Sequence, residues 1–154
     1  MKKQKSPIEQ IVQEEKRKPK NILFVCLKNI IRSRTAEMVF RQMLKEEEYS
    51  VADAKNKRTG KDYEFLVSSA GTDVEKGLTK KYCKQLDWKE GDSAYIIFTF
   101  DEGLEYKLIH RFFQPKEKII NLDIPEDYRI DNDSDRDTLR TILREKLVRY
   151  IPLP

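Results

Sequence analysis

The residues best suited to chemistry lie in one short segment. A cysteine is followed by five residues and then by an arginine–serine pair, in the run Cys26, Leu27, Lys28, Asn29, Ile30, Ile31, Arg32 and Ser33. When such a loop wraps onto a helix N-terminus, its backbone N–H groups can point inward and hold the oxygens of a phosphate. Arg32 would add a bidentate guanidinium, and the same positive field would favour the thiolate form of Cys26. The segment therefore predicts a phosphate cradle with a nucleophilic sulfur beneath it.

A phosphate ester bound in this cradle can be cleaved by the thiolate. The sulfur of Cys26 would attack phosphorus in line and form a phosphocysteine intermediate, while Ser33 donates a hydrogen bond to the thiolate or the leaving sulfur. Asn29 tolerates a left-handed backbone and can brace the loop. The leaving oxygen needs a proton from a general acid, and the carboxylate-rich stretch 123–133 offers several candidates.

The elements that must position these residues are predicted from hydrophobic periodicity. Continuous apolar runs predict four strands, at 21–26, 64–69, 94–99 and 118–122. Helical spacing predicts a helix through 36–44 that Arg32 and Ser33 open, helices over 79–86 and 101–112, and a last helix ending near Tyr150. Residues 45–63 are polar and indicate a long loop or insertion. The alternation predicts an α/β fold with a four-stranded parallel sheet, helices on both faces, and a ligand site at the carboxyl ends of the strands.

Length and composition set the broader class. The 154 residues fit one domain, which we expect at 21–154, preceded by a basic N-terminal arm at 1–20. The arm holds seven basic and three acidic side chains and accounts for the whole net charge of +4, so nothing requires the domain to bind nucleic acid. No apolar run approaches a membrane span, and the chain begins with no apolar signal segment. Two cysteines, Cys26 and Cys83, exclude a disulfide scaffold, and a cytoplasmic location is expected.

The chain resembles the low-molecular-weight protein tyrosine phosphatase family. The matching stretches are 22–37, 68–72, 96–102 and 124–139, and the chain is most similar to a short branch with a DIP-acid-DY sequence. The resemblance implies a flavodoxin-like three-layer fold with strand order 2-1-3-4. It also implies hydrolysis of phosphomonoesters without metal or cofactor, with Cys26 as the nucleophile and Arg32 as the phosphate ligand.

The resemblance also implies supporting residues. Asn29, Ser33 and Ser69 form the set of hydrogen bonds that braces the loop. Asp127 falls where the family has its general acid, and Asp123 is the second choice. From its position after Asp127, and not from the resemblance, Tyr128 is expected either to line the mouth of the site or to pack on the loop, with the mouth favoured.

Several residues depart from the common family pattern. Lys28 replaces a glycine, and Tyr128 replaces the proline that follows the acid. Arg129 and Ile130 stand where the commonest members have two aromatic residues that flank the phosphotyrosine ring. The phosphate cradle is thus better supported than a tyrosine-shaped pocket, and the alternatives for the substrate are a smaller or more polar phosphomonoester or an RNA phosphate end.

Two other functions fit the same segment. In the first, the cradle binds a phosphorylated protein or an RNA without turning it over, and the basic arm contributes to the grip. In the second, the fold reduces arsenate, which needs resolving thiols, and only Cys83 is available. A cysteine-dependent phosphatase is the leading hypothesis.

Overall fold

Five parallel strands form a single sheet in this computed structural model, which describes residues 7, 19–52, 63–75, 83–126 and 132–151. The strand order is β2-β3-β1-β4-β5. The strands are β1 (Lys20–Cys26), β2 (Val51–Ala52), β3 (Phe65–Gly71), β4 (Ile96–Thr99) and β5 (Ile119–Asn121). β1 lies at the centre, where it pairs with β3 on one side and β4 on the other.

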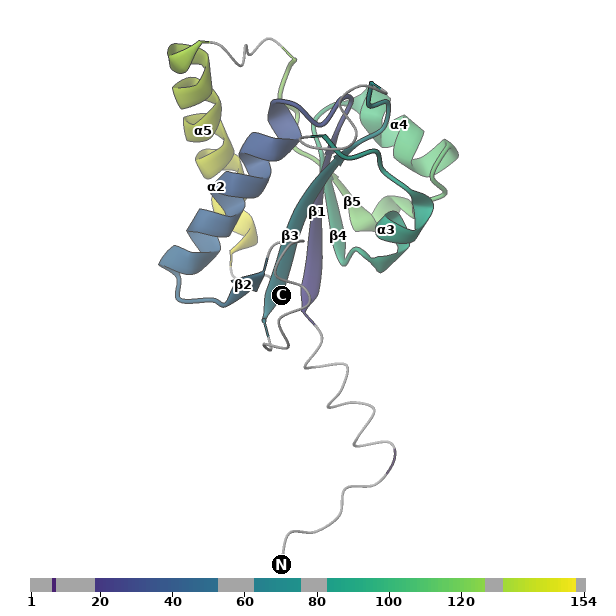
Figure 1. The fold of residues 1–154 in the computed structure, drawn as a ribbon, viewed down its shortest axis with the longest axis horizontal. Helices are drawn as coiled ribbons and strands as arrows, with labels where there is room; N and C mark the ends of the chain where they lie inside the picture. Colours follow the sequence, from purple (N-terminus) through teal and green to yellow (C-terminus); the bar gives the residue numbers. More distant parts are fainter. Residues whose placement is uncertain (1–6, 8–18, 53–62, 76–82, 127–131, 152–154) are drawn as a thin grey trace, which may run out of the picture.

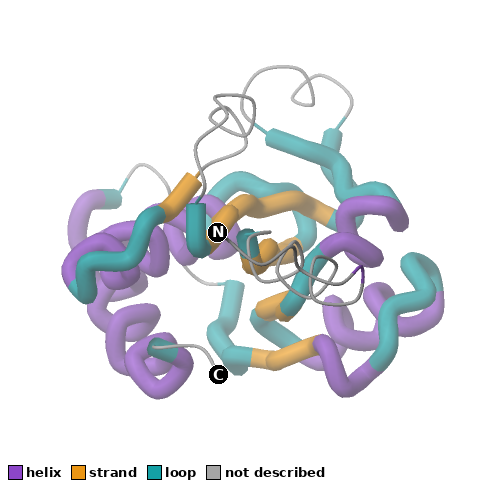
Figure 2. The backbone as a smooth tube through the Cα atoms, turned by 90° about the horizontal axis from the view of Figure 1, so that it is seen from below, coloured by secondary structure: helices purple, strands orange, loops and turns teal. Residues whose placement is uncertain are grey.

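Helices cover both faces of the sheet (Figures 1 and 2). One face carries α2 (Arg32–Glu46) and α5 (Asp133–Leu147), and the other carries α3 (Trp88–Ser93) and α4 (Glu102–His110). Short 3-10 turns occur at Lys116–Lys118 and Val148–Tyr150. None of the helices in the described part of the chain has the length and apolar character needed to span a bilayer.

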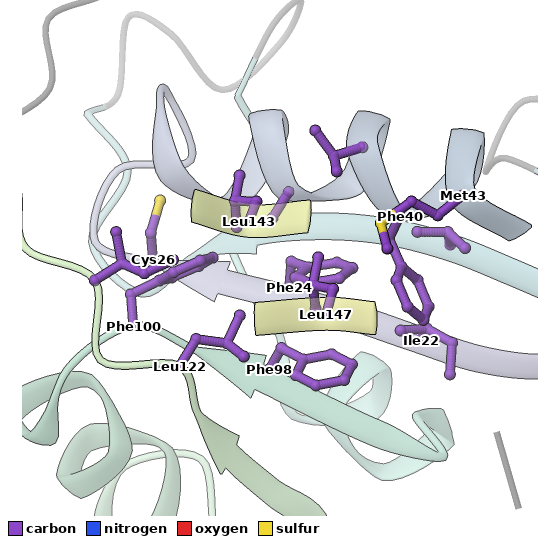
Figure 3. Close-up of a cluster of buried hydrophobic side chains, with 14 of the residues drawn as sticks. Ile22, Phe24, Cys26, Phe40, Met43, Phe98, Phe100, Leu122, Leu143 and Leu147 are labelled. Atoms are coloured by element: carbon purple, nitrogen blue, oxygen red, sulfur yellow. The ribbon is translucent and has the colours of Figure 1, made fainter. Parts of the chain in front are cut away.

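The central strand is buried on both faces, as its unbroken apolar run predicts. Alternate side chains from Ile22 to Cys26 join the cluster under α2 and α5, whereas Leu23 and Val25 join the cluster on the opposite face. In the first cluster Phe24 stacks on the ring of Phe98 with centroids 5.0 Å apart (Figure 3). This packing fixes the end of β1, and with it Cys26, against α2.

The predicted strands are confirmed, and their order 2-1-3-4 is that of β3, β1, β4 and β5. The predicted number of strands was wrong, because Val51 and Ala52 add a fifth strand at the edge. The helix predicted over 79–86 was wrong in its described part, since Gln85 bridges to Gly71 and the helix lies later, at α3. Residues 1–20 fall outside the described residues except for Pro7, Pro19 and Lys20.

Candidate active site

The loop that joins β1 to α2 is held against the end of the neighbouring strand. Cys26 lies in register with Gly71, the last residue of β3. The next two backbone N–H groups, of Thr72 and Asp73, donate to the carbonyls of Cys26 and Leu27 at 3.0 and 2.8 Å. A Cβ on Gly71 would lie 2.7 Å from the backbone nitrogen of Asn29, so only glycine allows this approach. The arrangement anchors the start of the predicted cradle.

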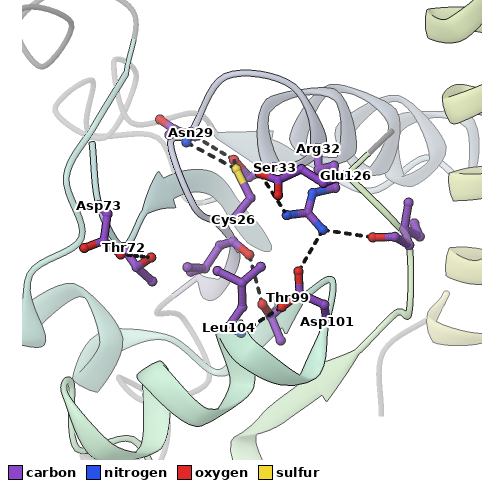
Figure 4. Close-up of polar contacts among 12 residues, drawn as sticks. Cys26, Asn29, Arg32, Ser33, Thr72, Asp73, Thr99, Asp101, Leu104 and Glu126 are labelled. Atoms are coloured by element: carbon purple, nitrogen blue, oxygen red, sulfur yellow. Dashed lines mark hydrogen bonds and ion pairs between the residues drawn. The ribbon is translucent and has the colours of Figure 1, made fainter. Parts of the chain in front are cut away.

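The cysteine sulfur is surrounded by hydrogen-bond donors. The Asn29 backbone N–H donates to Cys26 Sγ at 3.2 Å, and Ser33 Oγ lies 2.9 Å from the same sulfur (Figure 4). Asn29 Nδ2 donates to Ser33 Oγ at 2.8 Å, which leaves the serine hydroxyl proton free to point at the sulfur. Both groups therefore lie in position to donate a hydrogen bond to the sulfur.

Asn29 links three segments of the chain. Its Nδ2 also donates to Ser69 Oγ at 3.0 Å, and its Oδ1 accepts from the backbone N–H of Lys84 at 2.8 Å. Its φ of 55° is left-handed, as the sequence predicts for a residue that tolerates this conformation. The structure therefore brings together four predicted residues: Cys26, Asn29, Ser33 and Ser69.

Arg32 opens α2 and is buried, with 4% of its surface exposed. Its Nη1 donates to Asp101 Oδ2 at 3.1 Å and to the carbonyl of Ile124 at 2.9 Å. Its Nη2 lies 3.6 Å from Glu126 Oε1, so the guanidinium is placed between two carboxylates (Figure 4). The Phe100 ring supports its other side, with the guanidinium carbon 5.5 Å from the ring centroid. These contacts fix the guanidinium plane before any ligand binds.

A cavity of about 110 Å³ lies over this constellation, whereas a single water needs about 10–15 Å³. Its lining combines one cysteine, two cations, one carboxylate and two apolar side chains, from Cys26, Lys28, Ile30, Ile31, Arg32 and Glu126. The space therefore offers a tetrahedral oxyanion both a sulfur and a guanidinium. In the ranges that the structure describes, no group of three or more histidine, cysteine or acidic residues could hold a metal ion.

The predicted acids are not all in this cavity. Asp123 is exposed and has a φ of 53°, and it lines a different cavity together with Lys146 and Tyr150. The structure therefore does not bring Asp123 to the cradle. Asp127 and Tyr128 lie outside the described residues.

Sequence reasoning missed three groups that hold Arg32: Asp101, the Ile124 carbonyl and Glu126. Asp101 lies two residues after the predicted strand 94–99, at the carboxyl end of the sheet. That position could have indicated a residue of the ligand site. Asp101 also caps α4, since its Oδ1 accepts from the Leu104 N–H at 2.8 Å. A backbone carbonyl such as that of Ile124 leaves no sequence signal.

A second charge cluster supports the loop from outside the cavity. Asp73 accepts from Lys107 Nζ at 2.8 Å, from Arg111 Nη1 at 3.0 Å and from the Thr72 hydroxyl at 2.8 Å. These contacts, with Lys107 the largest cause, lower the pKa of Asp73 from its ordinary value near 3.8 to about 2. Because the N–H of Asp73 bonds to Leu27, the cluster ties α4 to the cradle.

The fold and the cradle define a class of protein, and comparison with known families gives the same class. The low molecular weight phosphotyrosine protein phosphatase family matches residues 21–148. The chain belongs to this family. A search of curated proteins found no match.

Solved structures share the fold at low sequence identity. Wzb from Vibrio vulnificus, in complex with benzylphosphonate, has a TM-score of 0.63 at 19% identity, covering 85% of this chain and 96% of its own. The tyrosine phosphatase Wzb from Escherichia coli K30, in complex with sulphate, has a TM-score of 0.60 at 15% identity, covering 84% and 94%. A mutant of the YwlE arginine phosphatase with a phosphorylated active-site serine has a TM-score of 0.62 at 18% identity, covering 86% and 97%. At these identities the likeness concerns the fold alone.

Proposed function

We propose that this chain is a phosphatase that hydrolyses phosphomonoesters through a phosphocysteine intermediate. One observation carries the proposal: Cys26 and Arg32 line one cavity, and the Asn29 N–H and the Ser33 hydroxyl both lie within hydrogen-bond distance of the sulfur. The thiolate forms the S–P bond as the bond from phosphorus to the ester oxygen breaks, and a general acid gives the leaving oxygen its proton. Water then attacks phosphorus, the S–P bond breaks, and inorganic phosphate leaves.

We propose Asp127 as the general acid. Its neighbour Glu126 lies in the cavity wall beside Arg32, which supports the placement of an acid from this segment over the leaving group. Glu126 is the adjacent alternative. To decide between Asp127 and Glu126, each carboxylate is removed in turn and kcat is measured on two substrates. These are phenyl phosphate, which has a poor leaving group, and p-nitrophenyl phosphate, which has a good one. Loss of the acid should lower kcat by about 10²–10⁴-fold on the former and less on the latter.

We further propose that the leaving group places an apolar surface, such as the phosphotyrosine ring, against Ile30 and Ile31. Ile30 and Ile31 form the uncharged part of the cavity lining and offer no hydrogen-bonding group to a polar leaving group. Two structural neighbours are described as phosphatases with different specificities, tyrosine for Wzb and arginine for YwlE. A tyrosine-phosphorylated peptide should therefore be a better substrate here than an arginine-phosphorylated one.

The test is hydrolysis of p-nitrophenyl phosphate in the presence of a chelator. We expect turnover that vanadate inhibits, that Cys26→Ser abolishes and that Cys83→Ala leaves intact, because Cys83 is buried away from the described cavity lining. Vanadate binding without turnover would favour the non-catalytic binding module. Absence of both would refute the proposal.

A further inference from the structure

The cavity contains a cation that the reaction described above does not use. Lys28 lines the same cavity as Cys26 and Arg32. Its Nζ pairs with Glu75 Oε1 at 3.1 Å, and the two side chains are 47% and 60% exposed. An ion pair exposed to this degree contributes little free energy, so it can open at small cost when a stronger anion arrives.

The two cations of the cavity are held very differently. Arg32 is buried, and its Nη1 is committed to Asp101 and the Ile124 carbonyl, so its position is fixed. Among the described residues, Lys28 has one side-chain partner, the exposed Glu75, and its long stem lets the ammonium follow a ligand. In the proposed function, Arg32 and the loop N–H groups bind the phosphoryl group that is cleaved. Lys28 is then available to an anion bound nearer the mouth.

We infer that Lys28 forms a second anion subsite, and that the preferred substrates carry a further phosphate or carboxylate on the leaving group. This inference rests on the proposed function, since it takes the cradle as the site of the first phosphoryl group. Glu75 would compete with the second anion for the ammonium. Removal of Lys28 and removal of Glu75 should therefore change the preference in opposite directions.

The experiment is calorimetric titration of the full-length protein with three non-hydrolysable anions. Methylphosphonate carries one anionic group, methylenediphosphonate a second phosphonate, and phosphonoacetate a carboxylate in that place. The quantity compared is the ratio of the Kd for methylphosphonate to the Kd for each two-anion probe. The wild-type ratio should exceed one, and the probe with the larger ratio identifies which second anion the subsite prefers.

The variants test whether Lys28 is responsible. Lys28→Met should lower the ratio by about two- to fivefold, and Lys28→Arg should keep it. Glu75→Gln should raise it by about twofold. Lys45→Met removes an exposed lysine from the far end of α2 and should leave the ratio unchanged.

Two results would overturn the inference alone. In one, methylphosphonate binds and the ratio is the same in wild type and Lys28→Met. In the other, Lys28→Met weakens all three anions equally, which would place Lys28 on the first phosphoryl group. If none of the anions binds the wild-type protein, the proposed cradle fails and the subsite fails with it.

Discussion

Substitution of Asn29 tests whether one side chain supports both the stability of the loop and the reactivity of the sulfur. Its amide makes three hydrogen bonds, with Ser33, Ser69 and the Lys84 N–H, and its backbone φ is 55°. At about 1 kcal/mol for each bond and about 1 kcal/mol for a left-handed alanine, Asn29→Ala should lower the free energy of unfolding by about 4 kcal/mol. A domain of this size is stable by about 5–15 kcal/mol, so the variant should still fold.

Two further variants separate the contributions. Asn29→Gly loses the same three hydrogen bonds but adopts the positive φ freely, so it should be about 1 kcal/mol more stable than Asn29→Ala. Asn29→Asp keeps the acceptor for Lys84 and can accept from both serine hydroxyls. It should lose little stability, yet it would turn the Ser33 hydroxyl away from Cys26 and slow the reaction of the sulfur.

The assay pairs urea unfolding with alkylation of Cys26 by iodoacetamide at pH 7 in a Cys83→Ala background. We expect Asn29→Asp to show the slower alkylation and lower kcat while its urea midpoint stays near that of the parent. Equal stabilities of the alanine and glycine variants would refute the backbone argument. A loss below about 1 kcal/mol in both would show that the three hydrogen bonds do not brace the loop.

Three other substitutions have defined outcomes. Gly71→Ala places a Cβ 2.7 Å from the Asn29 nitrogen, so the backbone must move. The free energy of unfolding in urea should fall by about 1–3 kcal/mol, and kcat/KM should also fall. Unchanged kinetics would contradict the close packing. Because the pKa of Asp73 is lowered to about 2, its ion pairs stabilise the fold above its ordinary pKa near 3.8, and this contribution is lost as the pH falls toward 2. Because 42% of the Asp73 side chain is exposed to screening solvent, the free energy of unfolding should fall by about 1 kcal/mol over this pH range. Asp73→Asn should not show this fall in acid unfolding. Identical pH profiles for the variant and the wild type would contradict the prediction. A lysine at position 32 cannot keep the hydrogen bonds to Asp101 and Ile124 while also presenting a guanidinium fork to phosphate. Arg32→Lys should therefore lower kcat/KM on p-nitrophenyl phosphate about 10²-fold. Full activity of this variant would show that Arg32 has no part in the mechanism.

The parts of the fold that could be predicted are those whose signal is local. The run from Ile22 to Cys26 is apolar throughout because β1 is buried on both faces, and the buried face of α2 repeats at helical spacing. The strand β2 has two residues, too few for any periodicity. The helix α3, with sequence WKEGDS, has no apolar stripe, and Asp87 caps its first turn by accepting from the Glu90 N–H. Tertiary contacts, not local pattern, determine such elements.

The same distinction applies to the candidate site. The cradle is contiguous in sequence, so Cys26, Asn29 and Ser33 could be predicted from one segment, and the structure brings them together. The partners of Arg32 come from segments 69 and 92 positions away in the chain. Their convergence depends on the order of the strands, which places the ends of β1, β4 and β5 side by side. Side-chain types alone could not rank Glu126 above Asp123.

Asp101 makes two contacts that link α4 to the candidate site. One carboxylate oxygen holds the first turn of the helix through Leu104, and the other holds the guanidinium of Arg32. Fraying of that turn would therefore also release one of the contacts that orient Arg32. Under the proposed function, a substitution that loosens the first turn of α4 should lower turnover without altering the cavity lining, because it releases the Asp101 contact to Arg32.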